Sequence, residues 1–167
     1  LMNAGPIIHT PLIVINAGPI EHFERWHVHT DGPPKSIRRV TDALDAERIA
    51  IREALGYGAP HFPLAHHYAK EGEIWMYGRG SHDRLTDSGD WRERLILNQH
   101  RYMREDLRVG LSFFTSVARL AGVATPLMKS FLAIGGAVCG EDFLHGGRTS
   151  ESLGLGGMDK AALQKAL

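Results

Sequence analysis

The amino-acid sequence predicts an all-α domain, and three observations support this. Residues 36–55 carry apolar side chains at helical spacing, and two Thr-Pro pairs mark the starts of helices. No run of alternating apolar and polar residues indicates a strand. A chain of 167 residues is most simply one domain, long enough to close a core without disulfides.

The first expected helix runs from Pro11 to about Ala17. Thr10 is a suitable N-cap residue, and proline is favoured at the first helical position. The Gly-Pro pair that follows is expected to break or kink this helix. This interpretation places His9 just outside the N-terminus of a helix.

The pentapeptide NAGPI occurs twice, at residues 3–7 and 16–20. The first copy leads to His9, and the second is interpreted as the exit from the first helix. The copies lie thirteen residues apart, and a helix turns about 100° per residue, so they would point to different faces. They are therefore not expected to form a structural repeat.

The clearest helix spans residue 36 to about residue 55 and follows a polar loop at 24–35. Gly56 provides its stop signal. The apolar positions that define its buried face are Ile37, Val40, Leu44, Ile51 and Leu55. Residues 57–89 are less periodic and rich in Gly, Pro and His, which predicts loops around a short helix near 63–71.

Helical signals return in the last third of the chain. A helix is expected to begin near Asp90 and to carry Leu95, Leu97 and Tyr102, and another segment continues helically from 105 to 122. The Thr-Pro pair at 125–126 then predicts a largely buried helix to about Cys139. Thr149 is a candidate cap of a short turn, and residues 158–167 are expected to form a terminal helix.

Composition narrows the possible classes of protein. The single cysteine, Cys139, excludes an internal disulfide, and this favours a reducing, cytoplasmic location. Nineteen basic residues balance nineteen acidic ones, so neither nucleic acid nor a membrane surface is an expected partner. The opening apolar stretch has no basic n-region and is interrupted by polar residues, which fits neither a signal peptide nor a membrane span. The chain begins with Leu and lacks a strand-linked G-x-G-x-x-G motif, so we expect it to be a piece of a longer protein.

His9 is the first candidate for chemistry. A lone histidine beside an apolar run is commonly a hydrogen-bonded structural residue. A functional role has a physical basis, because a helix N-terminus lowers the pKa of a nearby imidazole whereas a carboxylate partner raises it. Balanced effects of this kind would suit a group that transfers protons near neutral pH.

The second candidate is the segment HRYMRED at residues 100–106. Arg101 and Glu105 are four residues apart and could form an ordinary surface pair, with Asp106 complementing the start of the next helix. Alternatively, Arg101 and Asp106 reach one cleft if the helix bends between them. Arginine binds carboxylates with two hydrogen bonds, and an acid can orient a histidine.

Two further groups have weaker signals. His27, His29 and Asp31 would share one face of an extended segment, a spacing that metal ligands can have, but no thiolate pair or H-E-x-x-H motif accompanies them. Metal binding is therefore not predicted. Trp75 and Tyr77 lie in a Gly-rich stretch and are either packing residues or the wall of a ligand site.

Five segments resemble, in order and spacing, the C-terminal helical domain of the octopine/nopaline (opine) dehydrogenase family, over essentially all of residues 1–167. They are NAGPIIHTPL, TDALDAERIAIREALG, HRYMREDLRVGL, GVATP and GGRTSESLGL. The resemblance implies a helical bundle of the 6-phosphogluconate dehydrogenase C-terminal-domain-like type. It also implies an N-terminal Rossmann domain, absent from this chain, that holds NAD or NADP.

The resemblance implies an activity as well. Members of the family condense an amino acid with a 2-oxo acid and reduce the imine with NADH or NADPH. By motif, His9 and Asp106 would be the catalytic dyad, Arg101 would hold a substrate carboxylate, and Trp75 would pack against the amino acid. The family commonly has proline two residues after the aspartate, where this sequence has Arg108. This chain alone is expected neither to bind nicotinamide tightly nor to turn over.

Three alternatives remain open from the sequence. One is a related two-domain NAD(P)-dependent dehydrogenase that acts on a hydroxy acid. Another is a non-catalytic helical module in which the 36–55 and 126–139 helices form the face of a homodimer. A metal-dependent hydrolase is the third.

Overall fold

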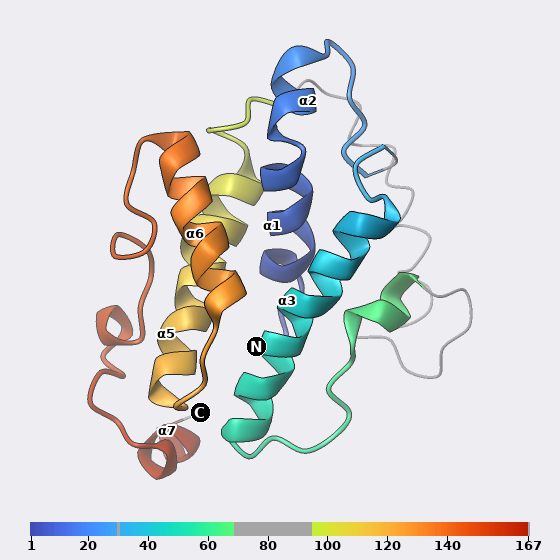
Figure 1. Cartoon of the computed structure of the whole chain (residues 1–167). Helices are drawn as coiled ribbons and strands as arrows, with labels where there is room; N and C mark the ends of the chain where they lie inside the picture. The colour runs from blue at the N-terminus through green and yellow to red at the C-terminus, as the bar shows by residue number, and fades with distance from the viewer. Residues whose placement is uncertain (30, 69–94, 167) are drawn as a thin grey trace.

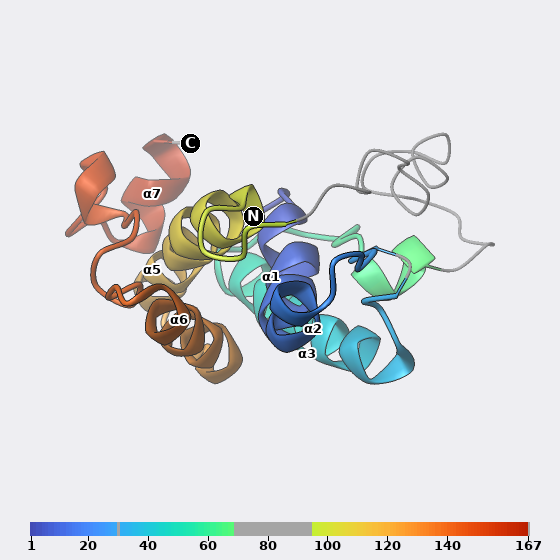
Figure 2. The ribbon, with the colours of Figure 1, turned by 90° about the horizontal axis from the view of Figure 1, so that it is seen from above.

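A computed structural model of the chain describes residues 1–29, 31–68 and 95–166. These residues form helices and loops and contain no strand, which confirms the all-α prediction (Figures 1 and 2). In chain order the elements are α1 (Gly5–Ile15), α2 (Ala17–His22), α3 (Lys35–Ala54), the 3₁₀ helix η1 (Leu64–Tyr68), the π-helix η4 (Tyr102–Leu111), α5 (Ser112–Leu120), α6 (Pro126–Cys139), the 3₁₀ turn η5 (Glu151–Leu153) and α7 (Lys160–Ala166).

Helix α1 is the central element and begins earlier than predicted. Proline stands at one of its first two helical positions, and Pro11, the predicted start, lies inside the helix. Pro6 fits there because the first N–H groups of a helix have no partner within it. The prediction that His9 precedes the helix is therefore wrong, because His9 lies in its second turn.

The second NAGPI copy also begins a helix, which corrects its interpretation as an exit. Its Gly-Pro pair lies in the first turn of α2, where a proline costs no hydrogen bond. The break between α1 and α2 falls at Asn16, whose side-chain amide donates to the backbone carbonyls of Leu12 and Gly32 at 2.8 and 3.1 Å. Both copies of the pentapeptide thus act as helix-start signals.

Helix α3 matches its prediction closely. It ends in a Schellman motif, in which Gly56 donates to the carbonyl of Glu53 and Tyr57 donates to that of Arg52. Gly56 has a φ of +88°, a conformation that residues with a side chain rarely adopt. The stop signal identified in the sequence therefore acts as expected.

The helix expected near Asp90 is not confirmed. Residues 90–94 lie outside the described residues, and Leu95 and Leu97 lie in a non-helical stretch and a turn. After residue 94, the first helical residue is Arg101. The helix continues through η4 into α5 without a break. The prediction of a helical segment from 105 to about 122 is confirmed.

Helix α6 begins and ends as predicted, but the backbone N–H groups at its N-terminus form hydrogen bonds with a side chain of another helix. Thr125 makes no side-chain cap. Instead the carboxylate of Glu47 on α3 accepts hydrogen bonds from the backbone N–H groups of Leu127 and Met128, at 2.8 and 3.0 Å. Thr149 does act as the predicted cap, since its hydroxyl accepts the N–H of Ser152 at 3.2 Å.

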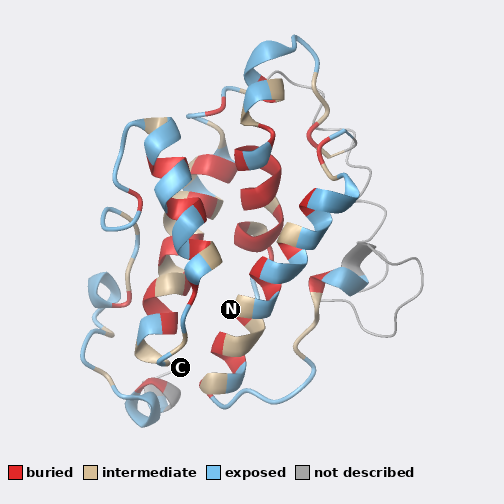
Figure 3. Cartoon of the chain, viewed as in Figure 1, coloured by how far each residue is buried: buried red, intermediate tan, exposed pale blue. Residues whose placement is uncertain are grey.

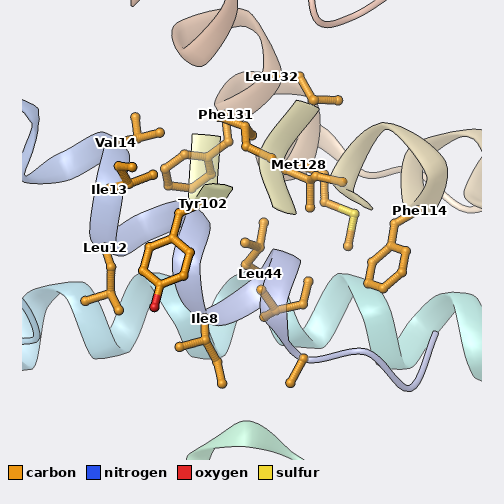
Figure 4. Close-up of a cluster of buried hydrophobic side chains, with 14 of the residues drawn as sticks. Ile8, Leu12, Ile13, Val14, Leu44, Tyr102, Phe114, Met128, Phe131 and Leu132 are labelled. Carbon is orange, nitrogen blue, oxygen red and sulfur yellow. The ribbon is translucent and has the colours of Figure 1, made fainter. Parts of the chain in front are cut away.

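The core lies where α1, α3, η4, α5 and α6 meet, and α1 packs most extensively against η4. Figure 3 shows α1 as mostly buried, and Figure 4 shows side chains from these helices packed together. Fully buried apolar residues include Ile7, Ile13, Leu44, Met103, Leu107 and Met128. Among the described residues, no helix is both long and apolar enough to cross a lipid bilayer.

A charged pair, Arg48 and Asp45, is enclosed in this core. Arg48 on α3 has no exposed surface and pairs with Asp45 one turn earlier, with Nε and Oδ1 2.5 Å apart. Its other nitrogens donate to the backbone carbonyls of Leu1, His61 and Phe62. Arg48 therefore connects α3 with both the first residue of the chain and the loop before η1.

Candidate functional site

The structure brings His9 of α1 and Asp106 of η4 into direct contact. Nδ1 of His9 lies 2.8 Å from Oδ2 of Asp106, across 97 positions of sequence. Their side chains are 16% and 13% exposed, so both can be reached from solvent. Because a carboxylate only accepts hydrogen bonds, Nδ1 carries the proton and donates it to Asp106. Among the described residues, none forms a hydrogen bond with Nε2 of His9.

Close packing of α1 against η4 makes this contact possible. A Cβ atom added to Gly5 would lie 2.4 Å from Oδ1 of Asp106, and one added to Gly110 would lie 2.4 Å from Cγ of Pro6. Both distances are shorter than real side-chain contacts. The two glycines therefore let the helices approach until the carboxylate reaches the imidazole.

The π-helical form of η4 sets the positions of the site residues. Its hydrogen bonds join residues five apart, so Arg101 and Asp106 lie on adjacent turns. Arg104 and Arg108 of η4 both form ion pairs with Glu141, which follows α6. π-Helical turns are rare and occur frequently at functional sites.

Aromatic residues surround the dyad. The ring of Tyr102 stacks on the imidazole of His9, with centroids 3.7 Å apart and an interplanar angle of 14°. A hydrogen bond of 2.8 Å joins the Tyr102 hydroxyl to Nε2 of His29. His100 contacts the same tyrosine edge-on, with centroids 4.5 Å apart.

Burial alters the protonation of these neighbours. Burial, with a smaller contribution from His9 and His100, lowers the pKa of His29 to about 4. Burial also lowers the pKa of His100, with a contribution from the adjacent Arg101, and it raises the pKa of the Tyr102 hydroxyl. At neutral pH, His29 and Tyr102 are therefore neutral groups beside the dyad.

Arg101 lies at the open edge of this cluster. Its side chain is exposed, and its guanidinium carbon lies 5.7 Å from the centre of the Tyr102 ring. That distance allows a cation–π interaction. A cation that can bind carboxylates therefore contacts the aromatic ring that stacks on His9.

The arrangement suits proton transfer next to an anionic ligand. Asp106 orients the imidazole and would stabilise its protonated form, and Nε2 is left to exchange protons with a bound molecule. A separate groove between α6 and residues 140–144 does not include His9 or Asp106. The His9–Asp106 pair therefore lies apart from this groove, where α1 meets η4.

Residues 1–139 match the family model described as "NAD/NADP octopine/nopaline dehydrogenase, alpha-helical domain". The chain belongs to this family. The match includes α1, η4 and α6, the elements that form and support the His9–Asp106 contact. The family that the sequence motifs indicated is therefore confirmed, together with the helical fold that it implies.

Several named relatives align with nearly the whole of this chain. Vitopine synthase from Allorhizobium ampelinum is 29% identical, opine dehydrogenase from an Arthrobacter species is 28% identical, and protein ocs from Agrobacterium tumefaciens is 33% identical. Each alignment covers 99–100% of this chain and 46% of the relative. The chain thus spans about half the length of these proteins.

The structure places some of the predicted site residues together and does not describe others. His9 and Asp106 touch, and Arg101 contacts the ring of Tyr102 that stacks on His9, but their functional roles remain predictions. Trp75 lies outside the described residues. Arg108, which replaces the family's usual proline, lies within η4, and its Nε is 3.3 Å from a carboxylate oxygen of Glu141.

The predicted arrangement of His27, His29 and Asp31 on one extended face is wrong. The chain turns here, because the N–H of Asp31 donates to the carbonyl of His27 at 2.7 Å. The Asp31 carboxylate accepts a hydrogen bond from the N–H of His27, while the side chain of His29 forms a hydrogen bond with Tyr102. Within the described parts of the chain, no three His, Cys, Asp or Glu side chains are grouped closely enough to hold a metal ion.

Sequence reasoning assigns no role in the site to three residues beside the dyad: Tyr102, His29 and His100. Tyr102 and His100 flank Arg101 directly, so their position next to a candidate residue was a usable signal. The sequence presents His29 only as a possible metal ligand. No local pattern predicts its contact with Tyr102, 73 positions away.

Replacing Gly5 by Ala is expected to break the hydrogen bond between His9 and Asp106. The new methyl group would overlap Oδ1 of Asp106, and the carboxylate is expected to move because it is the end of a side chain and shifts more readily than the α1 backbone. We expect Nδ1 and Oδ2 to separate beyond about 3.5 Å in a crystal structure of the variant. Alanine is compatible with the first turn of a helix, so the fold should survive.

Gly58→Ala is the matched control, since nothing lies within 4 Å of a Cβ at that position. It should leave the dyad unchanged. A Gly5→Ala structure that keeps the separation near 2.8 Å would contradict the packing argument.

Proposed function

We propose that this chain is the substrate-binding and catalytic domain of an opine-type dehydrogenase. The reaction is the reductive condensation of an amino acid with a 2-oxo acid, using NADH or NADPH. The observation that carries this proposal is the His9–Asp106 hydrogen bond, in a partly exposed position, in a chain of this family. The names of the relatives, an opine dehydrogenase and a vitopine synthase, support the same class of reaction.

The proposed dyad handles the protons of imine formation. Nε2 of His9 takes a proton from the ammonium group of the amino acid, and the free amine adds to the carbonyl carbon of the 2-oxo acid. The imidazolium then protonates the hydroxyl of the resulting carbinolamine, which leaves as water and gives an iminium C=N bond. Asp106 stabilises the imidazolium between these steps. Proton transfer of this kind contributes about 10²–10⁴-fold in rate.

Arg101 is the proposed carboxylate-binding residue. Both substrates carry carboxylates, and a guanidinium binds one with two parallel hydrogen bonds. Its exposed position beside Tyr102 would place the bound carboxylate next to His9. Trp75 is a further proposed contact of the amino-acid substrate, and this proposal rests only on the resemblance to the family.

The described residues do not suit a dinucleotide-binding role. They contain no strand that leads through a glycine-rich turn into a helix, the arrangement that binds a pyrophosphate. The family description names NAD/NADP, and this chain aligns with only 46% of each relative. On that basis we propose that a Rossmann domain outside this chain holds the cofactor, which would supply the hydride. This domain, and a second copy of the chain in a homodimer, are the proposed macromolecular partners, and the proposed location is the cytoplasm.

An assay of the full-length protein tests the proposal. NADH or NADPH oxidation is followed with pairs of an amino acid and a 2-oxo acid, and separately with the 2-oxo acid alone. Oxidation that requires both substrates, together with a secondary-amine product seen by mass spectrometry, is the expected result. Reduction of the 2-oxo acid without the amino acid would instead identify a hydroxy-acid dehydrogenase. Failure of every pair, in a protein that binds the cofactor, would contradict both.

A further inference from the structure

The imidazole of His9 is held on two sides by different kinds of contact. Asp106 binds one atom of its edge, at 2.8 Å, and the ring of Tyr102 covers its face at 3.7 Å. A single hydrogen bond fixes the direction of Nδ1–H but still permits the ring to rock about that bond. A stacked aromatic ring opposes such rocking. The two contacts together determine where Nε2 points.

Tyr102 is itself firmly held. It is 1% exposed, and Figure 4 shows its ring among apolar side chains that include Leu12 and Phe131. Its hydroxyl is joined to Nε2 of His29 at 2.8 Å, and His100 contacts its ring edge-on. Because the pKa of His29 is lowered to about 4, this hydrogen bond joins two neutral groups throughout the neutral pH range.

We propose that Tyr102, anchored by His29, is a positioning residue that fixes the plane of the His9 imidazole for proton transfer. The inference rests on the proposed function of the dyad. Tyr102 is not placed in contact with the reacting atoms. Its hydroxyl is bound to His29, so the contact it offers His9 is the face of its ring. Loss of the stack would let Nε2 move, and a displacement of about 1 Å can cost about 10²-fold in rate.

Two matched pairs of variants in the full-length enzyme test the proposal. Tyr102→Phe keeps the ring, and Tyr102→Leu removes it. His29→Gln keeps a hydrogen-bonding group for the tyrosine hydroxyl, and His29→Leu does not. We expect kcat to fall by about 10–100-fold in Tyr102→Leu. In Tyr102→Phe and His29→Leu it should fall by only a few fold, and in His29→Gln least of all. KM for both substrates should stay within about threefold in Tyr102→Phe and in both His29 variants, which keep the ring that Arg101 contacts.

A spectroscopic measurement separates positioning from general destabilisation. In the wild-type enzyme the Nδ1 proton of His9 should give a downfield, exchange-protected NMR resonance, assigned by its loss in Asp106→Asn. This resonance should persist in Tyr102→Phe and disappear or broaden in Tyr102→Leu, at a temperature where both are folded. A role in core stability alone would lower the unfolding temperature and leave the resonance in place.

The outcomes also distinguish this inference from the proposed function. If the dyad is not catalytic, Asp106→Asn will not lower turnover, yet the resonance will still report whether Tyr102 orders the imidazole. A Tyr102→Leu enzyme with kcat within threefold of wild type would overturn the inference. Equal losses of kcat in Tyr102→Phe and Tyr102→Leu would overturn it too, because the ring would then not matter. If Tyr102→Leu fails to fold, the His29 pair decides, and equal kcat in its two members would count against the anchor.

Discussion

Replacing Asp106 by Asn in the full-length enzyme is expected to lower kcat by about 10²–10⁴-fold. The side chain keeps its size but loses its charge, so it no longer stabilises a protonated His9. Its amide can also donate to Nδ1, which would move the imidazole proton to Nε2, the atom that must first accept a proton. Steady-state kinetics with saturating amino acid and 2-oxo acid measures the effect.

His9→Ala should cause a loss of similar size, and the double variant should be little slower than the slower single one. Groups that act as a unit show this strong non-additivity. Independent roles would instead multiply the two losses. Comparing the three variants therefore tests whether the contact seen in the structure is the functional unit.

Glu105→Gln is the matched control for Asp106→Asn. Glu105 is the preceding residue of η4, is exposed, and undergoes the same change from carboxylate to amide. It should retain kcat within about twofold. If Asp106→Asn also stays within a few fold of wild type, the assignment of the dyad is wrong, whatever the geometry of the site.

The parts of the fold that sequence reasoning predicted well depend on local signals. The Schellman motif that ends α3 needs only Gly56 and its neighbours, and α6 starts at a proline that suits a first turn. The pairing of His9 with Asp106 is a contact across 97 positions, which no local pattern specifies. Only the resemblance of five segments to one family predicts this contact.

The parts that were mispredicted depend on tertiary packing. Thr10-Pro11 has the composition of a helix start, but α1 is enclosed by α3, η4 and α6, and this packing supports a proline inside the helix. The π-helical form of η4 likewise coincides with two close approaches to α1, at Gly5 and Gly110, that sequence spacing does not reveal. The site residues that were missed, such as His29, are those whose partners lie on distant elements.

Replacing Arg48 by Met is expected to destabilise this chain by about 3–5 kcal/mol. Arg48 is completely buried, and methionine fills much of the same space. The change leaves the Asp45 carboxylate enclosed without its counter-charge, holding only the hydrogen bond from the N–H of Leu64 at 2.7 Å. It also removes the donors to the carbonyls of Leu1, His61 and Phe62. Urea unfolding followed by circular dichroism gives the difference in the free energy of unfolding.

Two further variants show whether the buried charge is the cause. Arg39→Met changes an exposed arginine of the same helix and should alter stability by no more than about 0.5 kcal/mol. Adding Asp45→Asn to Arg48→Met removes the uncompensated charge while its amide oxygen still accepts the N–H of Leu64. The double variant should therefore recover at least about 1 kcal/mol relative to Arg48→Met. If it recovers nothing, the loss comes from the freed carbonyls of the chain start and the loop before η1. Arg48 would then stabilise the fold mainly through its hydrogen bonds to backbone carbonyls and not as the counter-charge of Asp45.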